Sequence, residues 1–150
     1  MKRKRALAAA GVIVAGLAGG VTTAGANPPG PRASVRSVVI DANDPTVAYV
    51  TATYICYGGD GHLWVSVKES ENARYDPALA EEGSSADSAA WSQSHPQDFV
   101  CDGNWHTQTF TVDQDEQGFG TLRRGVGWVQ FCLFDAAGGA VFDQHFRAIR

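Results

Sequence analysis

Basic side chains are scarce in this 150-residue chain once its first five positions are set aside. Four of the 12 lysine and arginine residues lie at positions 2–5, whereas all 16 acidic residues follow position 40. The rest of the chain therefore carries 8 basic against 16 acidic side chains, a net charge of −8. Nucleic-acid phosphates and anionic membrane surfaces attract lysine and arginine. We therefore expect no nucleic-acid partner and no attraction to anionic membranes.

Motifs of catalysis and metal binding are also lacking. The sequence has no G-x-S-x-G element around a nucleophilic serine and no H-x-x-x-H or C-x-x-C pair with zinc-ligand spacing. The four histidines are scattered over separate predicted elements: His62, His95, His106 and His145. Acidic runs at 41–44 and 113–116 contain the oxygen ligands that calcium takes, but neither follows the EF-hand pattern. We interpret both runs as acidic turns and predict no catalytic residue, no metal site and no cofactor.

The first 26 residues have the three parts of an export signal. The basic positions 2–5 precede an uncharged stretch that ends in Ala24-Gly25-Ala26, an A-x-A cleavage pattern. The uncharged stretch is long enough for a membrane anchor, but its alanine and glycine content makes it weakly hydrophobic. We therefore predict a signal peptide at 1–26, cleavage before Asn27, a secreted, extracellular protein and no stable membrane insertion after cleavage.

Proline and glycine dominate the segment that follows, residues 27–33. Proline blocks both helix formation and sheet pairing, so this segment is expected to be an exposed leader. The domain then occupies 34–150, about 115 residues, which is a normal size for one domain with its own core.

Helical periodicity is nearly absent from this domain. Short runs of β-branched and aromatic residues alternate with Gly, Asn and Asp turns, which is typical of all-β proteins. We predict strands at 35–41, 47–57, 62–68, 99–102, 105–112, 126–134 and 141–149. Residues 69–97 carry six acidic residues and two prolines and break the pattern. They are expected to form a long exposed loop with one or two helical turns near 77–82.

Alternation along the predicted strands separates a core side from an outer side. In 47–57 the residues expected to point inward are Ala48, Val50, Ala52, Tyr54 and Cys56. In 62–68, Leu63, Val65 and Val67 lie on the side opposite Trp64. About seven such strands suggest two antiparallel sheets packed face to face as a β-sandwich. A closed barrel is the other arrangement that the pattern allows.

Three cysteines, Cys56, Cys101 and Cys132, leave one thiol unpaired within the chain. An exported protein can form a disulfide, but loop entropy does not select the pair. The chain-entropy model gives about 4 kcal/mol for Cys56–Cys101 and about 4.5 kcal/mol for Cys56–Cys132, which is too small a difference. The residue pattern alone therefore leaves the pairing open.

Three segments resemble a known family: Tyr54-Ile55-Cys56, the CDGNWH run at 101–106, and the alternating strand at 125–133. The chain is similar in these motifs to a family of uncharacterised secreted immunoglobulin-like domains common in actinomycetes, over roughly residues 35–149. The resemblance implies an immunoglobulin-like sandwich, a Cys56–Cys101 disulfide and no assigned activity.

The same resemblance implies which residues of the strand at 126–134 point inward, namely Gly127, Val129, Phe131 and Leu133. Cys132, which the family pattern does not require, then lies on the outer side. The rival arrangement bridges Cys56 to Cys132 across two sheets, as in antibody-type domains.

Aromatic residues give the clearest functional indication. By alternation, Trp64 and Trp128 lie opposite the presumed core, together with Cys132 and Phe134. An exposed aromatic strip on a sheet can stack on sugar rings or dock a protein. Two alternatives are that the 69–97 loop folds over these side chains, or that the two faces are inverted.

We therefore expect a secreted, non-catalytic binding or interaction domain for an unknown protein or glycan ligand. One alternative is a small secreted hydrolase, with His62 or His106 as the base and a carboxylate beside it. Another is an inhibitor of secreted enzymes that inserts the 69–97 loop into its target.

Overall fold

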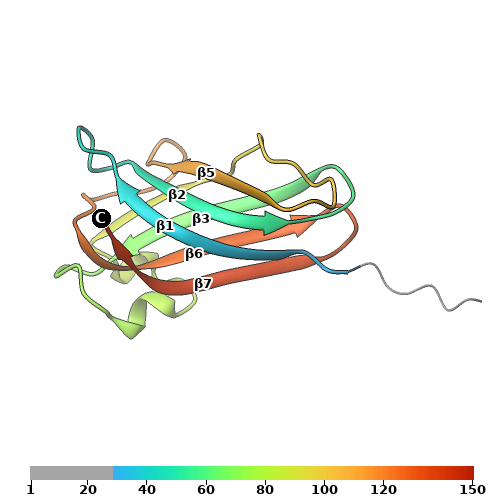
Figure 1. Cartoon of the computed structure of the whole chain (residues 1–150). Helices are drawn as coiled ribbons and strands as arrows, with labels where there is room; N and C mark the ends of the chain where they lie inside the picture. The colour runs from blue at the N-terminus through green and yellow to red at the C-terminus, as the bar shows by residue number, and fades with distance from the viewer. Residues whose placement is uncertain (1–28) are drawn as a thin grey trace, which may run out of the picture.

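The structure, a computed structural model, describes residues 29–150. These residues form seven strands and two short 3-10 helices (Figure 1). The strands are β1 (Arg32–Ile40), β2 (Ala48–Ile55), β3 (Gly61–Glu69), β4 (Ala90–Ser94), β5 (His106–Val112), β6 (Gly125–Asp135) and β7 (Ala140–Ile149). The 3-10 helices are η1 (Pro77–Ala80) and η2 (Ser84–Asp87). The predicted signal peptide and its cleavage site lie outside the described residues.

The seven strands belong to one sheet with the order β4-β3-β6-β7-β1-β2-β5. All neighbouring strands run antiparallel except β1 and β7, which run parallel. The two edges approach each other where Gln93 and Asp113 exchange backbone hydrogen bonds of 2.8 and 3.2 Å. The sheet therefore curls into a nearly closed, mixed barrel.

The all-β class and the number of strands are confirmed, whereas the antiparallel two-sheet sandwich is not. The alternation of inward and outward residues does not distinguish a sandwich from a barrel, because both folds bury one side of every strand. The feature that makes one sheet is the pairing of β1 with β7, which joins opposite ends of the described chain. The sequence gives no local signal for this pairing, because no hairpin turn connects β1 to β7.

The segment 69–97 is not the long exposed loop that its composition predicted. Its last part forms β4, which pairs with β3 over five positions. Its serines made this strand resemble a loop in the sequence. Their hydroxyl groups are satisfied, because Ser92 donates a hydrogen bond to the Thr46 carbonyl and Ser94 donates one to the Thr111 carbonyl. The predicted helical turn does appear, as η1. The predicted strand at 99–102 is wrong and is reduced to a single bridge between Gly59 and Cys101.

The core lies inside the barrel and contains the inward residues that alternation and, for β6, the family resemblance predicted. All of them are buried: Ala48, Val50, Ala52, Tyr54 and Cys56 of the second predicted strand, Leu63, Val65 and Val67 of β3, and Gly127, Val129, Phe131 and Leu133 of β6. The faces were therefore assigned correctly and are not inverted. No helix within residues 29–150 is long and apolar enough to cross a membrane.

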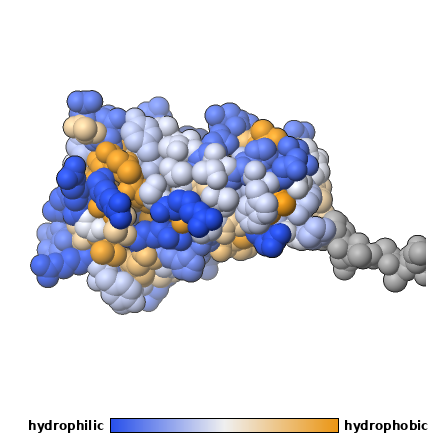
Figure 2. All heavy atoms as spheres, viewed as in Figure 1, coloured by the Kyte–Doolittle hydropathy of each residue, from blue (hydrophilic) through white to orange (hydrophobic). Residues whose placement is uncertain are grey.

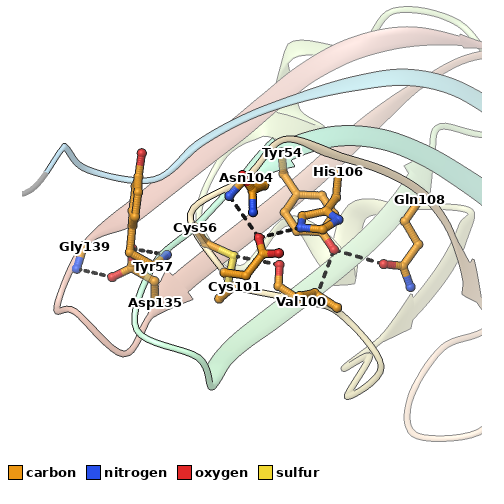
Figure 3. The surroundings of a disulfide bond; sticks show 11 residues. Tyr54, Cys56, Tyr57, Val100, Cys101, Asn104, His106, Gln108, Asp135 and Gly139 are labelled. Atoms are coloured by element: carbon orange, nitrogen blue, oxygen red, sulfur yellow. Dashed lines mark hydrogen bonds and ion pairs between the residues drawn. A yellow bond between two sulfur atoms is a disulfide. The ribbon is translucent and has the colours of Figure 1, made fainter.

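A disulfide joins Cys56 to Cys101 at one end of the barrel (Figure 3). Cys132 is a free, buried cysteine. The pairing implied by the family motifs is therefore confirmed, and the rival Cys56–Cys132 bridge is wrong. The backbone reinforces the same contact, since Gly103 N–H donates to Cys56 O and Gly59 N–H donates to Cys101 O.

Two turns pack together at this end, the β2–β3 turn and the β6–β7 hairpin. Gly58 has φ of 93°, and a Cβ there would lie 2.8 Å from Ala137 N, so a side chain does not fit. Asp135 ties the turns together, because its carboxylate accepts hydrogen bonds from Gly139 N–H and Tyr57 N–H (Figure 3). This end of the barrel carries part of the surface described next.

Candidate functional site

The four residues of the predicted binding face do share one side of the sheet. Strand register places Trp64 of β3 opposite Cys132 of β6, and Trp128 of β6 opposite Phe146 of β7. These residues lie on the outer surface, away from the barrel interior. Their environments nevertheless differ along the strands, so they do not form one continuous exposed strip.

The protein's own chain covers the Trp128 end of this surface. The Trp128 ring packs on Phe146 at 4.9 Å between centroids, and Phe146 packs on Tyr75 at 4.3 Å. Opposite Trp128, the buried Lys68 ammonium donates to the Ser84 hydroxyl at 3.0 Å. Tyr75 and Ser84 belong to the segment 70–89, which therefore folds over this part of the sheet. Trp128 is therefore half-buried rather than part of an open aromatic strip.

Cys132 lies on the outer side but is not an exposed contact residue. Only 4% of its surface is accessible, because it is small and lies between the larger Trp64 and Phe142 in the strand register. The Gln144 amide donates to its sulfur at 3.2 Å. Burial raises the pKa of the Cys132 thiol. Such a thiol is protonated and unreactive at neutral pH.

The open part of the outer surface carries a row of rings that crosses β7, β6 and β3. Phe142 and Phe134 pack edge to face at 5.4 Å, Phe134 lies 6.2 Å from His62, and His62 lies 5.3 Å from His95. We call these four residues the aromatic row. Phe142 is 56% exposed and Phe134 is 42% exposed, so two large apolar side chains remain in water side by side.

Trp64 borders the aromatic row rather than standing in it. Its ring is half-buried, and its indole N–H donates to the Gln93 side-chain oxygen at 2.8 Å. The aromatic row ends at His95, whose imidazole is paired with the Glu116 carboxylate. The surface thus has an apolar centre at the two phenylalanines and a polar rim at His95 and Glu116.

A different cluster surrounds His106, near the disulfide (Figure 3). The His106 Nε2 atom lies 2.8 Å from the Asp102 carboxylate, which also accepts a hydrogen bond from Asn104 N–H. These contacts hold the pKa of Asp102 well below its usual range. A histidine oriented by a carboxylate is an arrangement seen in general-base sites.

The neighbouring side chain of Tyr54 is unsuited to that chemistry. The Tyr54 ring lies 5.7 Å from the imidazole, and its hydroxyl donates to Gln108 and accepts from Val100 N–H. Burial raises the pKa of Tyr54, which keeps the phenol protonated. At Nε2 the partner of His106 is the carboxylate of Asp102 rather than a serine hydroxyl or a thiol.

The acidic runs are used to shape turns. The Asp41 carboxylate accepts the N–H groups of Asn43 and Asp44 and the Tyr49 hydroxyl, and Asp113 accepts Asp115 N–H. These bonds lower the pKa of Asp41. Within residues 29–150, no group of three histidine, cysteine, aspartate or glutamate side chains is arranged to hold a metal ion.

Sequence reasoning found Phe134 and missed two of its neighbours. Phe142 follows the same alternation on β7, so its outward direction was readable, but its contact with Phe134 required the β6–β7 register. His95 was counted within a loop because β4 was not predicted. Of the four histidines, the fold brings His62 and His95 together, whereas His106 and His145 bind Asp102 and Asp143 elsewhere.

Comparison with protein-family models gives no match for this chain, and comparison with curated proteins gives no significant match.

Proposed function

We propose that this protein is a secreted, non-catalytic binding domain that docks a protein ligand on the aromatic row. The observation that carries the proposal is the pair Phe134 and Phe142, which stay exposed in mutual contact on a regular, rigid part of the sheet. Contiguous exposed apolar surface with a polar rim is characteristic of interaction sites. Burying such rings against a partner is favourable by about 25 cal/mol for each Å² of apolar area.

The geometry of the two rings favours a protein over a glycan. Their planes are 79° apart, so Phe134 and Phe142 present one face and one edge rather than a common flat platform. Sugar stacking requires a ring face that lies open to the ligand, and the nearest tryptophan, Trp64, is half-buried. A protein side chain can instead insert against a face and an edge at once.

Secretion and the immunoglobulin-like family assignment belong to the same proposal. The Cys56–Cys101 disulfide supports export, because such bonds persist mainly in oxidising compartments. The motifs around these two cysteines and on β6 support the family resemblance.

The test compares retention of three proteins on immobilised extracellular proteins and insoluble glycans. They are the wild type, the double variant Phe134→Ser/Phe142→Ser, and the control Trp105→Ser, which alters a ring that is 53% exposed elsewhere. We expect a protein ligand that retains the wild type and the control but loses the double variant. Equal retention of all three on every surface would remove the aromatic row as the binding site.

A small hydrolase is the second candidate, because His106 and Asp102 form a carboxylate-oriented imidazole. Activity of the purified protein on ester, peptide and glycoside substrates, abolished by His106→Gln, would favour it over the binding domain. The inhibitor alternative has less support, because parts of the segment 69–97 are packed into the fold: Leu79 and Ser84 are buried, and Trp91 lies in β4.

A further inference from the structure

Five arginines gather at the end of the barrel where the sequence ends, although the domain is acidic overall. They line two hollows: Arg123, Arg124 and Arg150 line one of about 540 Å³, and Arg36, Arg147 and Arg150 line one of about 300 Å³. We call this region the arginine end. Figure 2 shows strongly hydrophilic residues framing exposed hydrophobic ones at this end, on the left of the view.

The smaller hollow arises where β1 and β7 separate. These strands are paired at one position, Val38 with Ile149. A bulge in β1 lies between Val35 and Ser37, and Val35 N–H donates to the Asp143 carboxylate at 2.6 Å rather than to a β7 carbonyl. The strands therefore leave a gap that is flanked by arginines of both.

Most of the positive charge here is not neutralised by the protein. Arg36 donates to the Thr53 hydroxyl, and Arg123 donates to the backbone carbonyl of Glu71. Arg123 also interacts electrostatically with the buried Glu69 carboxyl. Within residues 29–150, Arg147 is the one member of the five in an ion pair, at 3.2 Å from Asp143. Its Nε atom is buried without a hydrogen-bond partner, and an unsatisfied buried donor is unfavourable.

The opposing charges are few and already engaged. Asp143 also pairs with His145 at 2.8 Å. Asp41, which lines the larger hollow, has its carboxylate oxygens bound by Tyr49 and by two backbone N–H groups. The five guanidinium groups therefore remain in excess over the carboxylates that line the two hollows.

We propose that the arginine end binds a multivalent oxyanion, a small molecule that carries phosphate or carboxylate groups. Guanidinium groups bind both kinds of group through paired N–H donors. The two hollows share Arg150, so they can receive two anionic groups of one ligand. Val39, which is 44% exposed, and Leu122 form an apolar wall of the larger hollow that suits the carbon part of an organic anion.

This site is independent of the aromatic row. Phe142 lies near the start of β7, whereas Arg147 and Arg150 lie at and beyond its end. Loss of one site therefore leaves the other intact.

The experiment titrates the whole domain with pyrophosphate and, separately, with citrate, at an ionic strength held constant with sodium chloride. Amide NMR shifts and the melting temperature are recorded for the wild type and for Arg36→Gln and Arg150→Gln, which alter exposed side chains. The control is Arg74→Gln, an exposed arginine outside both hollows. We expect saturable shifts at residues 36–39 and 146–150, with affinity at least threefold weaker in both site variants and unchanged in the control.

The two titrations separate the sources of the anion. Saturation by pyrophosphate alone identifies a phosphate ligand, saturation by citrate alone a carboxylate ligand, and saturation by both a general oxyanion site. The proposal is overturned if neither anion gives saturable shifts in the wild type. It is equally overturned if Arg74→Gln weakens binding as much as the two site variants do, since binding would then reflect overall charge.

Discussion

Phe134 and Phe142 pack edge to face on neighbouring strands, with ring centroids 5.4 Å apart, and both remain substantially exposed. Core packing does not explain this pair, because the two rings lie on the outer side of the sheet. The turns beside them are joined through hydrogen bonds to the Asp135 carboxylate. A preformed apolar contact surface loses little conformational entropy on binding.

Removing these rings should therefore leave the fold stable. We expect the variant Phe134→Ser/Phe142→Ser to change the free energy of unfolding by less than about 1 kcal/mol, since surface substitutions are individually worth about 0.5 kcal/mol or less. Urea unfolding of the variant and the wild type measures this. A loss of several kcal/mol would mean that the rings serve stability rather than binding.

Glu69 makes stability depend on pH. Its side chain is fully buried, one carboxylate oxygen accepts Arg123 N–H, and the other has no partner. Burial raises the pKa of Glu69 from 4.5 to about 7. The folded state thus binds a proton more tightly than the unfolded chain does, and the stability that the neutral form confers is lost as pH rises from about 4.5 through 7.

Glu69→Gln should remove this dependence, because glutamine retains the acceptor for Arg123 N–H and carries no charge. We expect the variant to exceed the wild type by about 3 kcal/mol at pH 8 and by less than about 1 kcal/mol at pH 5, from about 1.4 kcal/mol for each pKa unit. Urea unfolding at both pH values gives the comparison. An identical difference at the two pH values would show that Glu69 does not titrate in this range.

The disulfide should contribute strongly to stability. It joins residues 45 positions apart, and the chain-entropy model gives about 4 kcal/mol for a loop of that length. We expect Cys56→Ala/Cys101→Ala to lower the free energy of unfolding by about 2–4 kcal/mol in urea titrations. Cys132→Ala controls for the loss of a thiol, and reductant should affect that variant but not the double variant.

Cys132 should be protected from reagents in the folded protein. Its thiol is buried and its pKa is raised by that burial, and only the thiolate reacts rapidly. We expect alkylation by iodoacetamide at pH 8 to be at least tenfold slower in the native protein than in 6 M guanidinium chloride. Equal rates in the two states would place this thiol at the surface.

The inward-facing half of each strand could be predicted because alternation is a local property. Val50 and Val65 were assigned to the core from their own strands alone, and both are fully buried. The pairing of β1 with β7 could not be predicted, since no local pattern encodes contacts between distant strands. β4 was missed because Ser92 and Ser94 give it a polar sequence, and the hydroxyl groups of both serines donate hydrogen bonds to carbonyls of other segments.

The sequence predicted the outward direction of residues in the candidate site, but not which of them stay exposed. The outward direction of Phe134 and Trp64 followed from alternation, but exposure depends on what packs above a residue. Phe146 and the segment 70–89 cover Trp128. The larger side chains on the neighbouring strands shield Cys132 from solvent. Burial by a neighbouring segment is a tertiary effect that the strand sequence does not contain.

The most direct test of a binding site at the aromatic row places a photo-crosslinking benzoylphenylalanine at position 142 of the protein, with position 119 as the control. Phe119 is also exposed, at 40%, but packs against Trp91 outside the aromatic row. We predict a discrete crosslinked protein adduct from position 142 that is absent from position 119 and is lost when Phe134→Ser is added. The same adducts from both positions, or an adduct from position 142 that persists with Phe134→Ser, would contradict a binding site at the aromatic row.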